Sequence, residues 1–291
     1  MNVIFLQDEK YPVLLRELKD APKQLYYKGR WDETIFENCL AVVGSRQMTA
    51  YGRQVVEKIV GEAAAAGLTI VSGFMYGVDA AAHKAALKAG GRTIAVMPCG
   101  IDLIHPEHQQ DLYVEILDNK GLVISEYQGD AQPAYWTYPQ RNRIVAGLSR
   151  AVLIVEAGEK SGSLITAGLA KKFGRKVFVV PGPITSQNSK GIMRLMRQGA
   201  APVADAEDIL KYYRKESKSG PEAKIIRDRK DIRNVNRSEG EILDILQREP
   251  MHIDDLARAL ARPASELGTI LSLLELRGLI RREGPKYYPF N

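Results

Sequence analysis

Short apolar runs recur at regular intervals along the first two thirds of the chain. They are LAVVGS (40–45), LTIVSG (68–73), RTIAVMP (92–98), GLVISE (121–126), RAVLIVEA (150–157) and KVFVVPG (176–182). Between them lie stretches with helical character at 49–66, 78–89, 107–119, 141–148, 163–173 and 192–198. Runs of this length are typical of buried parallel strands. Their alternation with helices predicts an α/β domain with a doubly wound, mostly parallel sheet at 38–210.

The two ends of the chain differ from this pattern. Residues 1–37 combine a short amphipathic helix with a strand-like end at Leu25–Tyr27, and we expect this N-terminal extension to pack on the core. Residues 238–291 contain three helical stretches, the third opened by Pro263 and closed by Gly278, followed by two short strand-like runs around Gly284-Pro285. Proline at a first helical turn and glycine past a helix end are ordinary boundaries. Three helices and a hairpin predict a small winged-helix domain.

The formal net charge of +6 is concentrated in one stretch. Residues 211–237 hold ten Lys or Arg against four Asp or Glu, which leaves 31 of each sign elsewhere (41 − 10 and 35 − 4). We expect this stretch to be a basic linker between the two domains. A basic segment is typical of a protein with a polyanionic partner, although a solvated connector is an equal alternative.

The sequence gives little sign of export, a membrane span or a disulfide framework. Cys39 and Cys99 lie far apart, and the first residues, MNVIFLQDEKYP, do not resemble a signal peptide. No apolar run approaches the roughly 20 residues that cross a bilayer. We therefore expect a cytoplasmic protein with no membrane partner.

Glycine, hydroxyl residues and cations follow the predicted strands. The first strand ends in Gly44-Ser45-Arg46, the second in Ser72-Gly73, and the fifth leads into Lys160-Ser161-Gly162-Ser163 with Thr166 on the next helix. Glycine lets backbone N–H groups approach a ligand, and a helix N-terminus favours phosphate. Any one of these glycines can simply form a tight turn, but their recurrence at one edge predicts a phosphate-binding site.

Several catalytic and metal-binding patterns are missing. G-x-G-x-x-G does not follow the first strand, and no P-loop or H-E-x-x-H occurs. We interpret His105 and His108 as surface residues rather than metal ligands. Asp79 and His83 share one helix face; an acid–base pair is conceivable there, and a structural role is the stronger interpretation. Nothing calls for a metal ion or a coenzyme.

A second candidate site combines aromatic and basic residues. Its members are Trp136, Tyr138, Arg141, Asn142 and Arg143. Aromatic rings stack on unpaired bases, and arginines contact phosphates. The mixture suits single-stranded DNA, whereas a packed loop with its arginines in salt bridges is the equal alternative.

The chain as a whole resembles the DprA (Smf) family. The resemblance is carried by AVVGSRQMTAYG, IVSGFMYGVDAAAHKAAL, IAVMPCGID, ISEYQGD, WTYPQRNRIVAGLS, VEAGEKSGSLITAGLA and GRKVFVVPG, over about residues 1–210, and by the C-terminal module. It implies an extended Rossmann-like fold and a non-enzymatic homodimer that binds single-stranded DNA. It also implies loading of the RecA recombinase onto DNA during natural transformation. The family pocket falls on 44–46, 141–143 and 160–166, and Lys172 and Arg175 are expected to border the basic surface.

One segment departs from the family pattern. Where the family has G-[ST]-N-x-L-I, this chain has Gly191-Ile192-Met193-Arg194-Leu195-Met196. Two polar positions of the family pattern are apolar here, which weakens the case for a ligand contact at this segment.

Two rival functions remain open. A phosphoribohydrolase of the lysine-decarboxylase-like Rossmann group resembles the stretch 72–83, but it needs a glutamate where this chain has Lys160 and hydroxyl residues. A duplex-binding repressor would place the third C-terminal helix in the major groove, where Glu266 and Glu275 would face phosphates. The wing residues Arg281, Arg282 and Lys286 are the features that favour the repressor.

Overall fold

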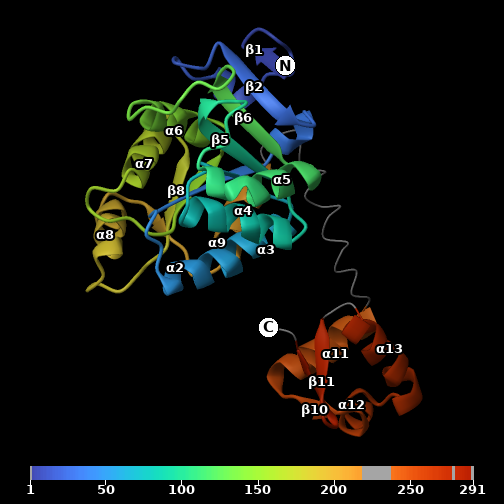
Figure 1. Cartoon of the computed structure of the whole chain (residues 1–291). Helices are drawn as coiled ribbons and strands as arrows, with labels where there is room; N and C mark the ends of the chain where they lie inside the picture. The colour runs from blue at the N-terminus through green and yellow to red at the C-terminus, as the bar shows by residue number, and fades with distance from the viewer. Residues whose placement is uncertain (1, 218–236, 277–278, 290–291) are drawn as a thin grey trace. The chain divides into compact units, whose positions relative to one another are not determined.

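A computed structural model describes residues 2–217, 237–276 and 279–289 of the chain. The chain divides into two compact units, an N-terminal α/β unit and a small C-terminal unit (Figure 1).

A nine-stranded sheet forms the centre of the N-terminal unit as the structure describes it. The strands lie in the order β1-β2-β6-β5-β4-β3-β7-β8-β9. The seven strands β6-β5-β4-β3-β7-β8-β9 pair in parallel with their neighbours. Beyond β6, the strands β2 and β1 are added in antiparallel pairing. The expected mostly parallel, doubly wound sheet is confirmed. The strands are β1 (Asn2–Phe5), β2 (Gln24–Gly29), β3 (Cys39–Val43), β4 (Thr69–Ser72), β5 (Thr93–Gly100), β6 (Leu122–Tyr127), β7 (Ala151–Ile154), β8 (Lys176–Val179) and β9 (Ala201–Pro202).

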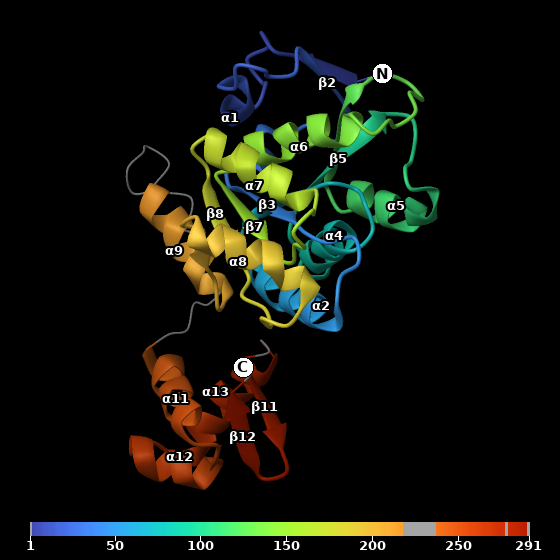
Figure 2. The same ribbon diagram turned by 90° about the vertical axis from the view of Figure 1, so that its left-hand side faces the viewer.

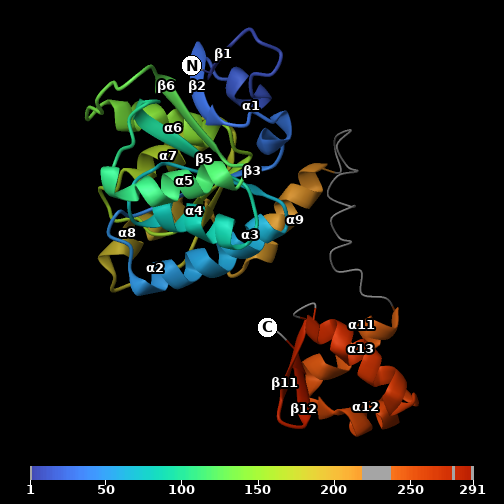
Figure 3. The ribbon, with the colours of Figure 1, turned by 45° about the vertical axis from the view of Figure 1, so that its right-hand side comes forward.

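Helices cover both faces of the sheet. Figure 2 shows α6 and α7 lying across one face, and Figure 3 shows α3, α4 and α5 lying across the other. The α-helices are α1 (Val13–Arg16), α2 (Ala50–Val55), α3 (Gly61–Ala65), α4 (Val78–Lys88), α5 (Gln110–Asp118), α6 (Thr137–Gly147), α7 (Ser163–Lys172), α8 (Lys190–Arg197) and α9 (Ala206–Ser217). The π-helical η2 (Val56–Val60) joins α2 to α3, and short 3-10 turns form η1 (Glu33–Phe36), η3 (Glu107–Gln109) and η4 (Gln187–Ser189).

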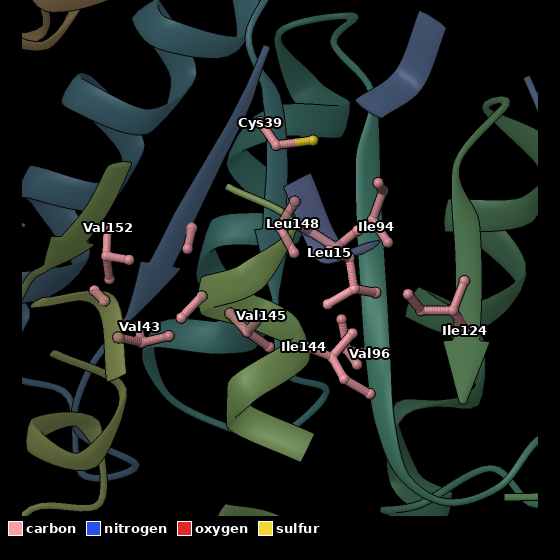
Figure 4. Close-up of a cluster of buried hydrophobic side chains, with 14 of the residues drawn as sticks. Leu15, Cys39, Val43, Ile94, Val96, Ile124, Ile144, Val145, Leu148 and Val152 are labelled. Carbon is pink, nitrogen blue, oxygen red and sulfur yellow. The ribbon is translucent and has the colours of Figure 1, made fainter. Parts of the chain in front are cut away.

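Alternate residues of each buried strand serve the two faces. On β3, Val43 packs with Ile144 and Val145 of α6 (Figure 4), and Ala41 belongs to the same cluster. Val42 belongs to the cluster on the opposite face. This alternation follows from the period of two in a strand. Because both faces are covered, the central strands read as continuous apolar runs rather than as alternating ones.

Two segments differ from the boundaries expected from the sequence. Helix α6 begins at Thr137, four residues before the expected start at Arg141, because Pro139 is tolerated within a first helical turn. Helix α9 continues to Ser217, into the stretch expected to be a linker. The remainder of that stretch, 218–236, lies outside the described residues.

The C-terminal unit is a winged helix, as expected. Its elements are α11 (Arg237–Arg248), β10 (Met251–His252), α12 (Ile253–Leu260), α13 (Ala264–Leu276), β11 (Ile280–Glu283) and β12 (Lys286–Pro289), with the strands in the order β10-β12-β11. Leu256, Leu267 and Leu271 lie in its buried core. The short β10, which pairs with β12, was not anticipated.

Candidate functional site

A cavity of about 620 Å³ opens at the carboxyl ends of β3 and β7. These two strands are neighbours in the sheet. The chain continues from β3 to β4 on one side of the pair and from β7 to β8 on the other side. A reversal of this kind leaves a crevice outside the strand ends, which is the usual ligand site in an open α/β sheet. Twelve of the residues predicted for the site line the cavity: Gly44, Ser45, Arg46, Gly73, Tyr138, Arg141, Asn142, Lys160, Ser161, Gly162, Ser163 and Thr166.

Two glycines at this rim are required by close packing. A Cβ on Gly44 would lie 2.6 Å from Val78 Cγ2, so the absence of a side chain lets α4 approach β3. A Cβ on Gly73 would lie 2.2 Å from Asp79 Oδ2 and 2.5 Å from Arg141 Nη1. The strand ends therefore carry glycine because neighbouring groups occupy the space of a side chain.

The segment that leads into α7 and the first turn of that helix supply one wall of the cavity. Ser161 and Ser163 place their hydroxyl oxygens 2.7 Å apart, and Thr166 follows on the same side of the helix. Lys160 is exposed just before this turn. A helix N-terminus with hydroxyl groups and a cation beside it is suited to an anionic group.

Arg46 and Tyr138 form another wall. The Arg46 guanidinium carbon lies 5.1 Å from the centroid of the Tyr138 ring. Within the described part of the chain, neither Arg46 nor Lys160 forms an ion pair. Both cations therefore remain available to a ligand.

The floor of the cavity holds Arg141 and Asp79. The buried Arg141 donates Nη1 to the Val96 carbonyl and Nε to Asn142 Oδ1, at 3.2 Å in the second bond. Burial raises the pKa of the Asp79 carboxyl, and the charge of Arg141 opposes that rise. Among the lining residues that the structure describes, Asp79 is the one carboxylate, and its contacts are with the floor.

Glu156 ties three loops of the rim together. Its carboxylate accepts hydrogen bonds from the Thr49 backbone N–H at 3.0 Å and from the Thr49 hydroxyl. The Asn188 amide donates to Glu156 Oε2 at 3.5 Å and to the Gln47 carbonyl at 2.9 Å. This buried carboxylate is engaged in holding the rim, which leaves it poorly placed to act as a base.

Five predicted site residues do not line the cavity. Ser72 is buried and donates its hydroxyl to the Val42 carbonyl at 2.6 Å. The side chain of Arg143 is buried in a 2.5 Å ion pair with Glu126. Trp136 is 62% exposed, and its indole packs edge-on against Tyr127, with ring centroids 6.0 Å apart.

Lys172 and Arg175 lie at the other end of α7, near the amino end of β8. Arg175 donates Nη2 to the Leu14 carbonyl at 2.9 Å and lies 3.4 Å from a Glu17 carboxylate oxygen. The structure therefore does not bring these two cations to the cavity.

The histidines at 83 and 105 have different surroundings. His83 is fully buried and lies 2.6 Å from both the Gly73 carbonyl and the Thr93 hydroxyl, so it supports the floor. Burial lowers the pKa of His83 to about 4. His105 Nε2 lies 2.9 Å from the Tyr138 hydroxyl. The described residues contain no group of three His, Cys, Asp or Glu that could hold a metal ion, and no described helix is long and apolar enough to cross a membrane.

Sequence reasoning missed several lining residues. Gln47, Met75, Tyr76 and Ile165 lie within three residues of predicted positions, so proximity to the strand-end motifs is the signal that could have identified them. Asn188 comes from the turn before α8, outside any strand-end motif. None of 191–196 lines the cavity.

Comparison with known proteins identifies relatives of both units. A family model described as DNA recombination-mediator protein A matches residues 2–214, and one described as DprA winged helix domain matches 229–284. The DNA processing protein DprA of Streptococcus pneumoniae is 44% identical over 206 residues, which cover 71% of this chain and 72% of that protein. Protein Smf of Escherichia coli is 37% identical over 282 residues, covering 96% and 75% of the two chains.

Two solved structures are similar in fold over about three quarters of this chain. The S. pneumoniae DprA structure has a TM-score of 0.68 at 40% identity and covers 72% of this chain and 73% of its own. The structure of DNA processing protein A from Helicobacter pylori, from work on its single-stranded DNA binding mode, has a TM-score of 0.66 at 32% identity and covers 74% and 97%.

Proposed function

This chain belongs to the DprA family of DNA recombination mediators, and from that premise we propose that the cavity at β3 and β7 binds the backbone of single-stranded DNA. The observation that carries the proposal is that two cations with no ion pair among the described residues, Arg46 and Lys160, lie around one cavity with the N-terminal turn of α7. The H. pylori relative, studied for its single-stranded DNA binding mode, supports the choice of ligand.

The ring of Tyr138 supports single-stranded rather than duplex DNA. It lies in the cavity wall under Arg46, where an unpaired base could stack against it. Bases in a duplex are already stacked on their neighbours, so they would not reach such a ring.

The test is a filter-binding comparison of single-stranded and duplex DNA. We expect preference for the single strand, and we expect Lys160→Ala to weaken that binding by about tenfold or more, because a lost charge-assisted contact costs about 1.5–3 kcal/mol. Lys172→Ala is the matched control, since it removes a lysine from the other end of α7. Equal affinity for both DNA forms, or equal effects of the two substitutions, would argue against the cavity.

A glycosidase activity on nucleoside monophosphates is the rival function. The carboxylate of Glu156 is committed to Thr49 and Asn188, and Lys160 precedes the helix where the rival enzymes carry a glutamate. We therefore propose binding without chemical conversion. Release of free base from nucleoside monophosphates would overturn this part of the proposal.

The proposal extends to assembly and to the recombinase. Family membership supports a homodimer that loads RecA onto DNA in the cytoplasm, during natural transformation in bacteria that take up DNA. Sedimentation equilibrium tests the dimer. Recombinase filament growth on DNA coated with single-strand-binding protein, with and without this chain, tests the loading; unchanged growth would count against it.

A further inference from the structure

Tyr138 is held from two sides in the cavity wall. The guanidinium of Arg46 lies over its ring at 5.1 Å, and His105 Nε2 lies 2.9 Å from its hydroxyl oxygen. His105 comes from the segment after β5, whereas Tyr138 is in the first turn of α6. The hydrogen bond therefore links a third strand end to the wall of the cavity.

The charged groups around His105 make its protonation state sensitive to a ligand in the cavity. The charged and titratable groups that face it are Arg46 from the loop after β3, Glu107 and His108 from the turn that follows, and Tyr138 from α6. Burial lowers the pKa of the His105 imidazole, and the positive charge of Arg46 lowers it further. The imidazole is only half-buried, so it can exchange protons with solvent.

We propose that His105 is a positioning residue that couples phosphate binding at Arg46 to the uptake of one proton, by reversing the hydrogen bond between His105 and Tyr138. The inference rests on the proposed function, because the phosphate is that of the bound strand. In the free protein the Tyr138 hydroxyl donates to the neutral Nε2. In the complex the protonated Nε2 donates to the Tyr138 oxygen, which frees the Tyr138 O–H to donate to the phosphate.

The coupling has a simple electrostatic cause. A phosphate beside Arg46 offsets the charge that disfavours imidazolium, so the pKa of His105 rises when the strand binds. The proton comes from solvent and no covalent bond changes. The gain in affinity is complete below the pKa of the free protein and is lost as the pH rises through the pKa of the complex.

Titration calorimetry measures this coupling directly. Binding of an oligothymidylate of about 20 nucleotides is followed in buffers of different ionisation enthalpy, because the slope of observed heat against that enthalpy gives the protons taken up. Thymine takes up no proton between pH 5 and 8, so the signal belongs to the protein. We expect uptake of up to one proton, with the amount set by the pH, and an affinity gain of at most about tenfold per pH unit as the pH falls.

Three variants identify the group. His105→Gln keeps a hydrogen-bonding side chain without titrating, so it should bind at pH 8 with near wild-type affinity and take up no proton. Tyr138→Phe keeps the ring and removes the hydroxyl, and it should also lose the uptake. His108→Gln is the control, because His108 packs against Tyr76, at 6.2 Å between ring centroids. This variant should retain the proton uptake.

The outcomes separate this inference from the proposed function. Binding by the wild type without proton uptake, or uptake that persists in His105→Gln, overturns the role of His105 and leaves DNA binding intact. Failure of the wild type to bind the oligonucleotide at all overturns both.

Discussion

The two ends of the parallel sheet use their cations in different ways. At the carboxyl end, Arg46 and Lys160 face a cavity and form no ion pair within the described residues. At the amino end, Arg175 donates to the Leu14 carbonyl, and Arg92 donates to the Thr34 hydroxyl at 2.8 Å. The first pair is free for a ligand, and the second pair ties down the N-terminal segment.

The difference shows how little net charge says about a binding site. Outside residues 211–237 the chain carries equal numbers of positive and negative residues. A cation becomes useful to a ligand where glycine turns and a helix N-terminus leave it without a carboxylate partner.

The largest predicted effect is a loss of stability at low pH, caused by His83 beneath the cavity. Its pKa is lowered from 6.5 to about 4, so the unfolded chain takes up a proton before the folded one does. The contribution of His83 to the free energy of unfolding is complete above pH 6.5. As the pH falls from 6.5 to 4, the free energy of unfolding decreases by on the order of 3 kcal/mol. Urea unfolding followed by the fluorescence of Trp31 and Trp136, both in the N-terminal unit, measures it. A pH dependence that is the same in His83→Asn would contradict the assignment.

The second-largest effect should come from Gly73→Ala, at the carboxyl end of the sheet where the cavity lies. The added Cβ meets Asp79 and Arg141 within 2.5 Å, so we expect about 2 kcal/mol of lost stability and weaker binding of single-stranded DNA. Gly168→Ala is the control, because a Cβ there meets nothing within 4 Å and alanine favours the helix by roughly 0.5–1 kcal/mol. Thermal unfolding and filter binding of both variants check the pair; similar behaviour would show that the floor is not closely packed.

Arg175→Ala should give the smallest effect, on stability alone. It removes the bond to the Leu14 carbonyl, for an expected loss of about 1 kcal/mol with unchanged DNA affinity. Lys172→Ala, on an exposed neighbour, should stay within about 0.5 kcal/mol of the wild type. A drop in affinity without a change in unfolding would place Arg175 in the binding surface after all.

Most of the fold could be predicted from the sequence because its signals are local. The apolar runs marked the parallel strands, and glycine marked the ends that meet at the cavity. The start of α6 was expected four residues too late, because proline is a weak guide to a helix start when it lies within the first turn, as Pro139 does. The strands β1 and β2 join the sheet through pairings with distant residues, such as Tyr26 with Ser125, which no local pattern reveals.

The candidate site was predictable only in part. The motifs predicted that Arg46 and Lys160 lie at one rim of the sheet, and both line the cavity because the strand order brings their loops together. Successive residues of α6 point in different directions, so Asn142 lines the cavity whereas the adjacent Arg143 pairs with Glu126. Which arginine has a carboxylate partner depends on tertiary packing, and composition does not show it.

The salt dependence of single-stranded DNA binding tests the contrast between the ends most directly. The logarithm of affinity falls with the logarithm of salt concentration by about 0.7 per phosphate contact with a single strand. We predict that the double variant Arg46→Ala/Lys160→Ala makes this fall less steep, by about 1.4 in the slope. The double variant Lys172→Ala/Arg175→Ala should leave the slope unchanged. Equal changes in both double variants, or a change only in the second, would contradict the account.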